Sequence, residues 1–242
     1  MKKTKLQPEQ IAMLIVKRLK NFWGYGNLKS SIWLIGMEEG LGKNEGFPLE
    51  RFQVTDGKSV VDITDNIETD HKRWFKSKAS TQPTYRKLIY ILLYLELKRK
   101  PTIEEIRDFQ INEFGRTESN HAILELMPLP AKSIKKTDWI YQDMPLIGLT
   151  DREEYLASYK PNRVQALRLL IEQYQPKLVL FYSRTYLKDW QSIILPKQFK
   201  EVIPGKLHSV KIKNTVYAVT AHPTSRGMKN DDWLQIAKNL YK

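Results

Sequence analysis

Three short segments of the sequence place a carboxylate or an imidazole inside or directly after an apolar run. Glu38 and Glu39 lie between glycines in Gly36-Met-Glu-Glu-Gly40, Glu125 interrupts a second apolar run, and His222 follows a third. A positioned carboxylate can orient water or face a developing cation, and an imidazole can hydrogen-bond a developing anion. The three segments together therefore provide candidate groups for acid–base chemistry and for stabilising charge on a ligand.

The apolar runs predict the elements that must bring these segments together. Continuous apolar runs at 31–36, 121–127, 177–183 and 215–220 predict buried strands, the second ended by Pro128 and the last forming a hairpin with residues 209–213. Apolar residues at helical spacing predict helices between them. Buried strands separated by helices predict a three-layer α/β/α fold with a central, mostly parallel four-stranded sheet. Ligands bind such sheets beyond the carboxyl ends of the strands, where the three segments lie.

The predicted helices fill the remaining chain without a linker. We expect an N-terminal helix at about 8–22, a core helix at 84–98, a helix that Thr102 and Glu105 cap, a long helix at 151–174 and a last helix that Asp231 and Asp232 cap. With no internal repeat or low-complexity tract, residues 1–242 are predicted to form a single domain.

The composition favours a polyanionic partner. Lys and Arg number 40 against 27 Asp and Glu, a net charge of +13. Such an excess favours binding to nucleic acid, because each neutralised phosphate releases counterions. A surplus that only keeps the protein in solution is the alternative.

The residue types also narrow the chemistry. The sequence contains no cysteine, which excludes disulfides, thiolate nucleophiles and iron–sulfur clusters, and its four histidines lie far apart. We therefore predict neither a metal nor a cofactor. No apolar run reaches the roughly 18 residues of a membrane span, and the basic opening is not followed by a long apolar segment. A cytoplasmic protein without a membrane partner is expected.

The three segments, in this order, resemble the motifs of the uracil-DNA glycosylase superfamily from about Ile32 to the C-terminal helix. In that family a first strand ends in a loop holding the residue that positions water, and a middle strand ends in a residue that reads the base. A late strand runs into His-Pro-Ser, whose loop enters the DNA minor groove. The resemblance implies a DNA glycosylase in which Glu38 and His222 are catalytic and neither a covalent nucleophile nor a metal is needed.

The resemblance also implies roles for other residues. Phe47 resembles the aromatic residue on which the extruded base stacks. The residues expected to bind the base are Glu125, Phe47, Glu39 and Met37. Those expected to contact the DNA backbone or enter the duplex are Ser225, Arg226, Thr224, Lys132 and Ser133.

Departures from the family pattern bear on the substrate. Glu38 stands where many members have Asp or Asn, and Glu125 where Asn reads uracil. A carboxylate accepts hydrogen bonds from the amino group of cytosine, whereas uracil presents a carbonyl there. Gly36-Met-Glu-Glu-Gly40 and Leu126-Met-Pro-Leu-Pro130 look like branches that act on hypermodified phage bases. The favoured substrate is therefore glucosylated 5-hydroxymethylcytosine in double-stranded phage DNA, and the favoured role is antiviral defence.

Other interpretations stay open at this stage. A uracil or deaminated-base repair glycosylase fits the same motifs, and a non-catalytic nucleic-acid-binding protein fits the same scaffold. Glu38 and Glu39 could cap a turn, and His222 could be a structural histidine. Glu125 could be paired in the core, and Phe47 could belong to the core.

Overall fold

An eight-stranded sheet forms the centre of the computed structural model, which describes residues 6–42, 46–65 and 73–240. The strand order is β3-β1-β4-β2-β5-β8-β7-β6. The strands are β1 Gly24–Gly26, β2 Ile32–Gly40, β3 Val60–Val61, β4 His121–Ala131, β5 Leu178–Tyr182, β6 Lys200–Ile203, β7 Leu207–Ile212 and β8 Thr215–Thr220. The four predicted strands are its centre: β4, β2, β5 and β8 lie side by side and parallel.

The prediction of only four strands is wrong, because both edges of the sheet are extended. β1 pairs antiparallel with β4 and parallel with β3, and β7 joins β8 to β6 through antiparallel pairs. β1 and β3 have three and two residues, too few to show a period of two in the sequence. Three of the four residues of β6 are exposed, so it carries no apolar run. The predicted hairpin of β7 and β8 is confirmed, with β8 inside the sheet.

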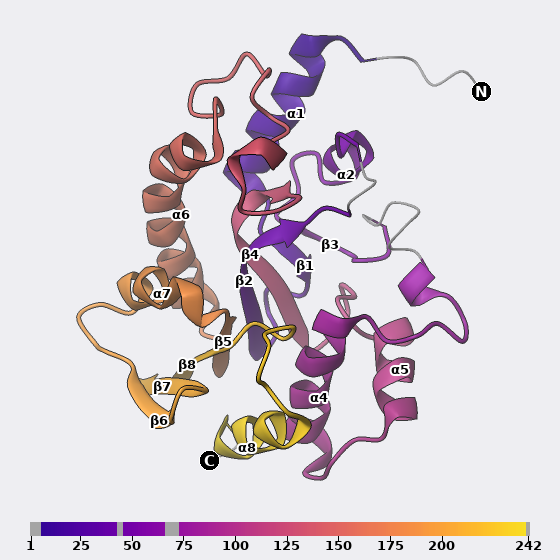
Figure 1. The fold of residues 1–242 in the computed structure, drawn as a ribbon, viewed down its shortest axis with the longest axis vertical. Helices are drawn as coiled ribbons and strands as arrows, with labels where there is room; N and C mark the ends of the chain where they lie inside the picture. The colour runs from indigo at the N-terminus through magenta and orange to yellow at the C-terminus, as the bar shows by residue number, and fades with distance from the viewer. Residues whose placement is uncertain (1–5, 43–45, 66–72, 241–242) are drawn as a thin grey trace.

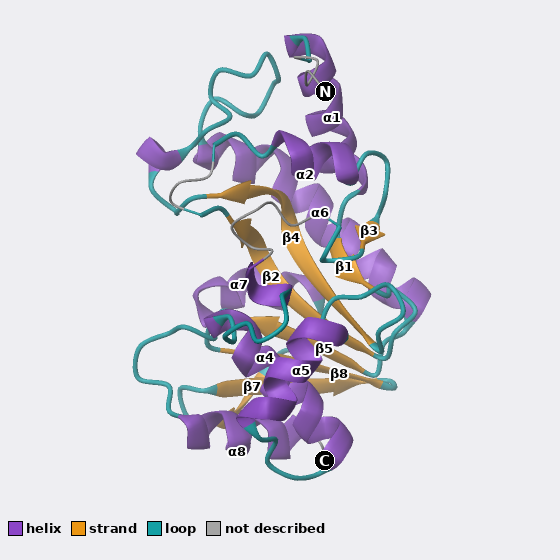
Figure 2. Ribbon diagram, turned by 90° about the vertical axis from the view of Figure 1, so that its right-hand side faces the viewer, coloured by secondary structure: helices purple, strands orange, loops and turns teal. Residues whose placement is uncertain are grey.

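Helices cover both faces of the sheet. They are α1 Pro8–Asn21, α2 Leu49–Val54, α4 Pro83–Leu97, α5 Ile103–Asn112, α6 Arg152–Tyr174, α7 Leu187–Ile193 and α8 Asn230–Leu240, with short 3-10 helices η1 Arg73–Phe75, η2 Lys136–Asp138 and η3 Arg184–Tyr186. Figure 1 shows α6 and α7 on one side of the sheet and α4, α5 and α8 on the other. Figure 2 looks onto α4 and α5, with the strands passing behind them. Neighbouring residues of β2 alternate accordingly, with Leu34 in the core under α4 and Ile35 in the core under α6.

The predicted helix boundaries are confirmed to within a few residues. Thr102 and Glu105 form the reciprocal capping box of α5, and the Asp151 side chain accepts from the backbone N–H of Glu154 at the start of α6. Asp231 and Asp232 lie in the first turn of α8, where carboxylates favour the positive end of the helix dipole. Across the described residues, no helix combines the length and the apolar character needed to cross a membrane.

β4 continues through two prolines, so the prediction that Pro128 ends this strand is wrong. Side chains from outside the sheet hydrogen-bond its backbone there. Arg18 donates through Nε to the Pro128 carbonyl at 2.8 Å, and the Tyr155 hydroxyl accepts from the Leu129 N–H at 3.0 Å. The Tyr141 hydroxyl donates to the Pro130 carbonyl at 2.9 Å. These side chains therefore pair three backbone groups of β4 at the positions where its prolines interrupt the regular hydrogen bonds of the sheet.

Candidate active site

The four central parallel strands each place one polar side chain toward their carboxyl ends. These side chains are Glu125 of β4, Glu38 of β2, Tyr182 of β5 and His222 just after β8. Ile35 of β2 pairs with Phe181 of β5, which pairs with Val219 of β8. Glu38 and His222 each lie three residues beyond this shared row, on strands separated by β5 alone. At ordinary strand spacing the two backbones are about 10 Å apart, a span comparable with one nucleoside. The predicted proximity of Glu38 and His222 is therefore compatible with the topology.

Glu38 is held by an arginine that lies 114 positions further along the sequence. Arg152, the first residue of α6, donates through Nη2 to Glu38 Oε1, and only 11% of the Glu38 side chain is exposed. Glu38 Oε2 is buried without a hydrogen-bond partner among the described residues. Burial raises the pKa of Glu38, while the Arg152 charge opposes that rise. One oxygen is thus fixed by the protein, and the other has no hydrogen bond within the part of the chain that the structure describes.

Glu125 lies deeper than Glu38 and is hydrogen-bonded across a glycine. The Tyr182 hydroxyl donates to Glu125 Oε1 at 2.8 Å, from the strand on the other side of β2. Gly36 of β2 lies between them, and a Cβ there would be 2.3 Å from Glu125 Oε2 and 2.5 Å from the Tyr182 hydroxyl. Only glycine leaves room for this hydrogen bond, which explains the glycine at the start of the first motif.

The protonation state of Glu125 corrects the reasoning about the base. Burial and, to a smaller extent, the nearby Glu39 and Glu38 charges raise its pKa to about 8, against the opposing effect of the Tyr182 hydrogen bond. At pH 7 the carboxyl is therefore mostly protonated and offers both a donor and an acceptor. The preference for cytosine expected from the sequence requires an ionised, acceptor-only carboxylate. A neutral Glu125 does not by itself favour cytosine over uracil.

His222 is oriented by its own loop. The backbone N–H of Thr224 points at His222 Nδ1 at 3.3 Å, and the Thr224 hydroxyl lies 2.9 Å from the same nitrogen. Nδ1 is therefore the acceptor, and the proton of the neutral ring is on Nε2. Burial lowers the pKa of His222, which keeps the ring neutral at pH 7. The ring centroid lies 6.1 Å from that of Tyr182, so His222 adjoins the Glu125 pair.

A basic concavity of about 520 Å³ adjoins His222. Arg184, Lys206 and Arg226 contribute to its lining, and none of its described lining residues is acidic. Lys206 is bound to Asp232 at 2.5 Å, which leaves the two arginines as the main positive charges. Ser225 also lines this concavity, and its N–H donates to the His222 carbonyl at 2.8 Å. Ser225 and Arg226 are thus placed beside His222, in line with their predicted contact to a DNA backbone.

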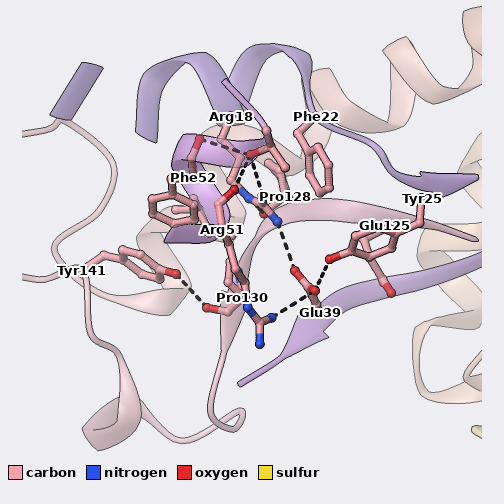
Figure 3. Close-up of polar contacts among 12 residues, drawn as sticks. Arg18, Phe22, Tyr25, Glu39, Arg51, Phe52, Glu125, Pro128, Pro130 and Tyr141 are labelled. Atoms are coloured by element: carbon pink, nitrogen blue, oxygen red, sulfur yellow. Dashed lines mark hydrogen bonds and ion pairs between the residues drawn. The ribbon is translucent and has the colours of Figure 1, made fainter. Parts of the chain in front are cut away.

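Glu39 has a different environment from its neighbour, and its predicted contact with the base is corrected here. Figure 3 shows Arg18, Arg51 and Tyr25 converging on its carboxylate. Arg18 and Arg51 each lie 3.0 Å from a Glu39 oxygen, with 1% and 2% of their side chains exposed, and the Tyr25 hydroxyl donates to Oε1. The Arg18 guanidinium also lies 3.8 Å from the centroid of the Phe22 ring. Glu39 therefore compensates two buried cations that join α1 and α2 to β2.

Two other predicted base-binding residues lie in the core. Met37 is 5% exposed and belongs to the core beneath α6, so it is not placed to line a base pocket. Phe47 is half-buried and packs edge-on against Phe52 and Tyr141, with ring centroids 5.6 and 5.8 Å away. Its stacking on a base stays a prediction, while its packing in this aromatic cluster is observed.

Of the remaining residues predicted to contact DNA, one is an exposed lysine and two use their hydroxyl groups in contacts within the protein. Lys132 is exposed just after β4. The Ser133 hydroxyl donates to Asp138 at 2.5 Å, so it shapes its own loop. Thr224 is exposed, but its hydroxyl and N–H both face His222, so it orients the imidazole.

Sequence reasoning missed the residues that hold the acids in place. Arg152 follows the helix cap Asp151 and resembles any exposed first-turn residue, so nothing local indicated its pairing with Glu38. Arg18 did carry a signal, since it lies within the apolar face of α1 beside Ile15 and Leu19. An arginine on a buried helix face requires a partner, which could have directed attention to a structural carboxylate.

In comparisons with known proteins, no family model matches the sequence, and no curated protein resembles it significantly.

Proposed function

We propose that this protein is a DNA glycosylase that hydrolyses the N-glycosidic bond of a flipped-out base and leaves an abasic site. The observation that carries the proposal is the position of Glu38 and His222 at the carboxyl ends of β2 and β8. There, Glu38 has a buried oxygen without a hydrogen-bond partner among the described residues, and the Nε2–H of His222 lies on a strand about two strand spacings away. A carboxylate and a neutral imidazole at this separation suit the two ends of a dissociating nucleoside.

Glu38 acts at the sugar in this proposal. As the base departs, positive charge develops on the sugar ring, as in glycoside hydrolysis. The ionised Glu38 stabilises that charge, and its free Oε2 accepts a hydrogen bond from the attacking water and takes its proton. Arg152 holds Oε1, so the carboxylate is fixed before the substrate binds.

His222 acts at the base. Its Nε2–H donates to the negative charge that develops on the departing base, while Thr224 fixes the ring from behind. A neutral imidazole suits this role, because it donates a hydrogen bond without transferring its proton to the base. Arg226 and Ser225 hold the adjacent phosphate in the basic concavity.

The proposed substrate is a modified cytosine, with glucosylated 5-hydroxymethylcytosine in phage DNA as the first candidate and antiviral defence as the role. This step rests on the sequence resemblance. Uracil is a second candidate, because a protonated Glu125 combines a donor and an acceptor, as the amide of a uracil-reading asparagine does. Above pH 8, where Glu125 ionises, its acceptor-only carboxylate favours the amino group of cytosine.

The test is base release from duplexes that differ in one nucleotide. Matched duplexes carrying uracil, cytosine, 5-hydroxymethylcytosine or its glucosylated form are incubated with the protein, and abasic sites are scored by alkaline strand cleavage. We expect cleavage at the glucosylated base and none at cytosine. Cleavage of uracil alone supports the repair interpretation. Tight binding without release from any duplex contradicts the enzymatic proposal and favours the binding protein.

A further inference from the structure

The loop from Lys132 to Asp151 begins and ends at the candidate site. It leaves β4 after Ala131, which pairs with Gly40 of β2, and it returns at Arg152, the partner of Glu38. Figures 1 and 2 both show it at the opposite end of the molecule from α8. The residues next to either end of this loop therefore lie near the end of β2 that carries Glu38.

Hydrogen bonds hold this loop in a defined shape. Trp139 donates through Nε1 to the Leu149 carbonyl at 2.7 Å and ties its two halves together. Near its start, the Ser133 hydroxyl donates to Asp138 at 2.5 Å and accepts from the Lys135 N–H at 3.0 Å. This turn encloses Ile134, so its side chain is presented on a fixed backbone.

Ile134 is an exposed apolar side chain between two lysines of the same turn. It is 71% exposed, and Lys132 and Lys135 on either side are also exposed. Three residues of extended chain span at most about 11 Å, so Ile134 lies near Ala131 and the end of β2. Ile147, in the same loop, is 94% exposed but has Asp143 and no lysine or arginine within five residues before it.

We propose that Ile134 is a wedge that enters the base stack of DNA, with Lys132 and Lys135 on the flanking phosphates. An isoleucine that inserts between base pairs unstacks them and kinks the duplex, which favours extrusion of a nearby nucleotide. The lysines select DNA as the occupant over an apolar protein surface, because burying them against apolar atoms is unfavourable. The proposal rests on the proposed function in one respect, that DNA is the partner.

The experiment measures unstacking separately from catalysis. A duplex with 2-aminopurine beside the target nucleotide becomes fluorescent when that base loses its stacking partner. We expect wild type to raise the fluorescence at saturation, Ile134→Ala to lose most of that rise with about tenfold weaker binding, and Ile134→Leu to keep it. Ile147→Ala is the control within the loop and leaves the rise unchanged. Lys132→Ala lowers the dependence of log K on log salt by about one unit.

The outcomes separate this proposal from the glycosylase assignment. A full fluorescence rise with saturating Ile134→Ala, or an equal loss with Ile147→Ala, overturns the wedge even if base release persists. A rise that depends on Ile134, without release of any base tested, supports the wedge and contradicts the glycosylase. No binding of wild type to duplex DNA overturns both.

Discussion

Glu38 and Glu39 are adjacent residues of one strand, yet their environments differ in a way that separates chemistry from structure. Glu39 contacts two arginines and a tyrosine, and its charge is compensated within the protein. Glu38 has one arginine and an oxygen that is buried without a partner among the described residues. An acid saturated with partners stabilises the fold, whereas an acid with an unused oxygen can act on a ligand. The resemblance gave Glu38 the catalytic role and Glu39 a contact with the base, and the partners of the two side chains in the structure separate them further.

The largest expected effect follows from removing the charge of Glu38. Glu38→Gln keeps the shape but loses the anion that faces the sugar, and we expect base release to fall by about 10²- to 10⁴-fold. Single-turnover base release measures it. Glu38 must be ionised to act, and burial raises its pKa above the ordinary value of 4.5. As the pH is lowered, the wild-type rate is therefore expected to fall with a midpoint above pH 4.5. A variant with an unchanged rate removes Glu38 from the mechanism.

Truncation of His222 tests the other end of the nucleoside. His222→Ala removes the Nε2–H donor, and we expect a loss of about 10²- to 10³-fold in the same assay, comparable with loss of one oxyanion-hole donor. His222→Gln retains an N–H donor and recovers part of the rate. Equal rates for His222→Ala and wild type would show that the imidazole is structural.

Glu39→Gln is expected to affect stability more than chemistry. It leaves Arg18 and Arg51 buried without a full countercharge, which costs about 3 kcal/mol in the free energy of unfolding. Urea denaturation measures this loss, and base release per folded molecule stays within a few-fold of wild type. A stable variant with a large loss of activity would reverse the roles of the two acids.

A pH dependence of the stability is assigned to Glu125. Its folded-state pKa of about 8 lies above the ordinary 4.5, so the folded protein holds a proton that the unfolded chain releases. The contribution to stability is fully present below pH 4.5 and is lost as the pH rises toward 8. Glu125→Gln mimics the protonated form. Urea denaturation at pH 5 to 9 is expected to show a smaller decline for this variant, and an identical decline for both proteins would refute the assignment.

The strands and helices, and the end of the sheet where the candidate site lies, could be predicted from the sequence. The residues that pair with Glu38 and Glu125 could not. The apolar runs and helix caps are local, so the central strands and most helices could be predicted from them. The pair of Glu38 and Arg152 joins residues 114 positions apart, and that of Glu125 and Tyr182 joins residues 57 apart. The protonation of Glu125 depends on burial that only the folded chain creates. The prolines of β4 misled because their backbone partners come from other elements.

The most direct test compares the two neighbouring acids in one assay. Single-turnover base release is measured for wild type, Glu38→Gln and Glu39→Gln, at a temperature where circular dichroism shows all three folded, on the duplex that wild type cleaves. The account predicts a loss of at least about a hundredfold for Glu38→Gln and a change within about threefold for Glu39→Gln. Equal losses for both variants, or a larger loss for Glu39→Gln, would contradict it.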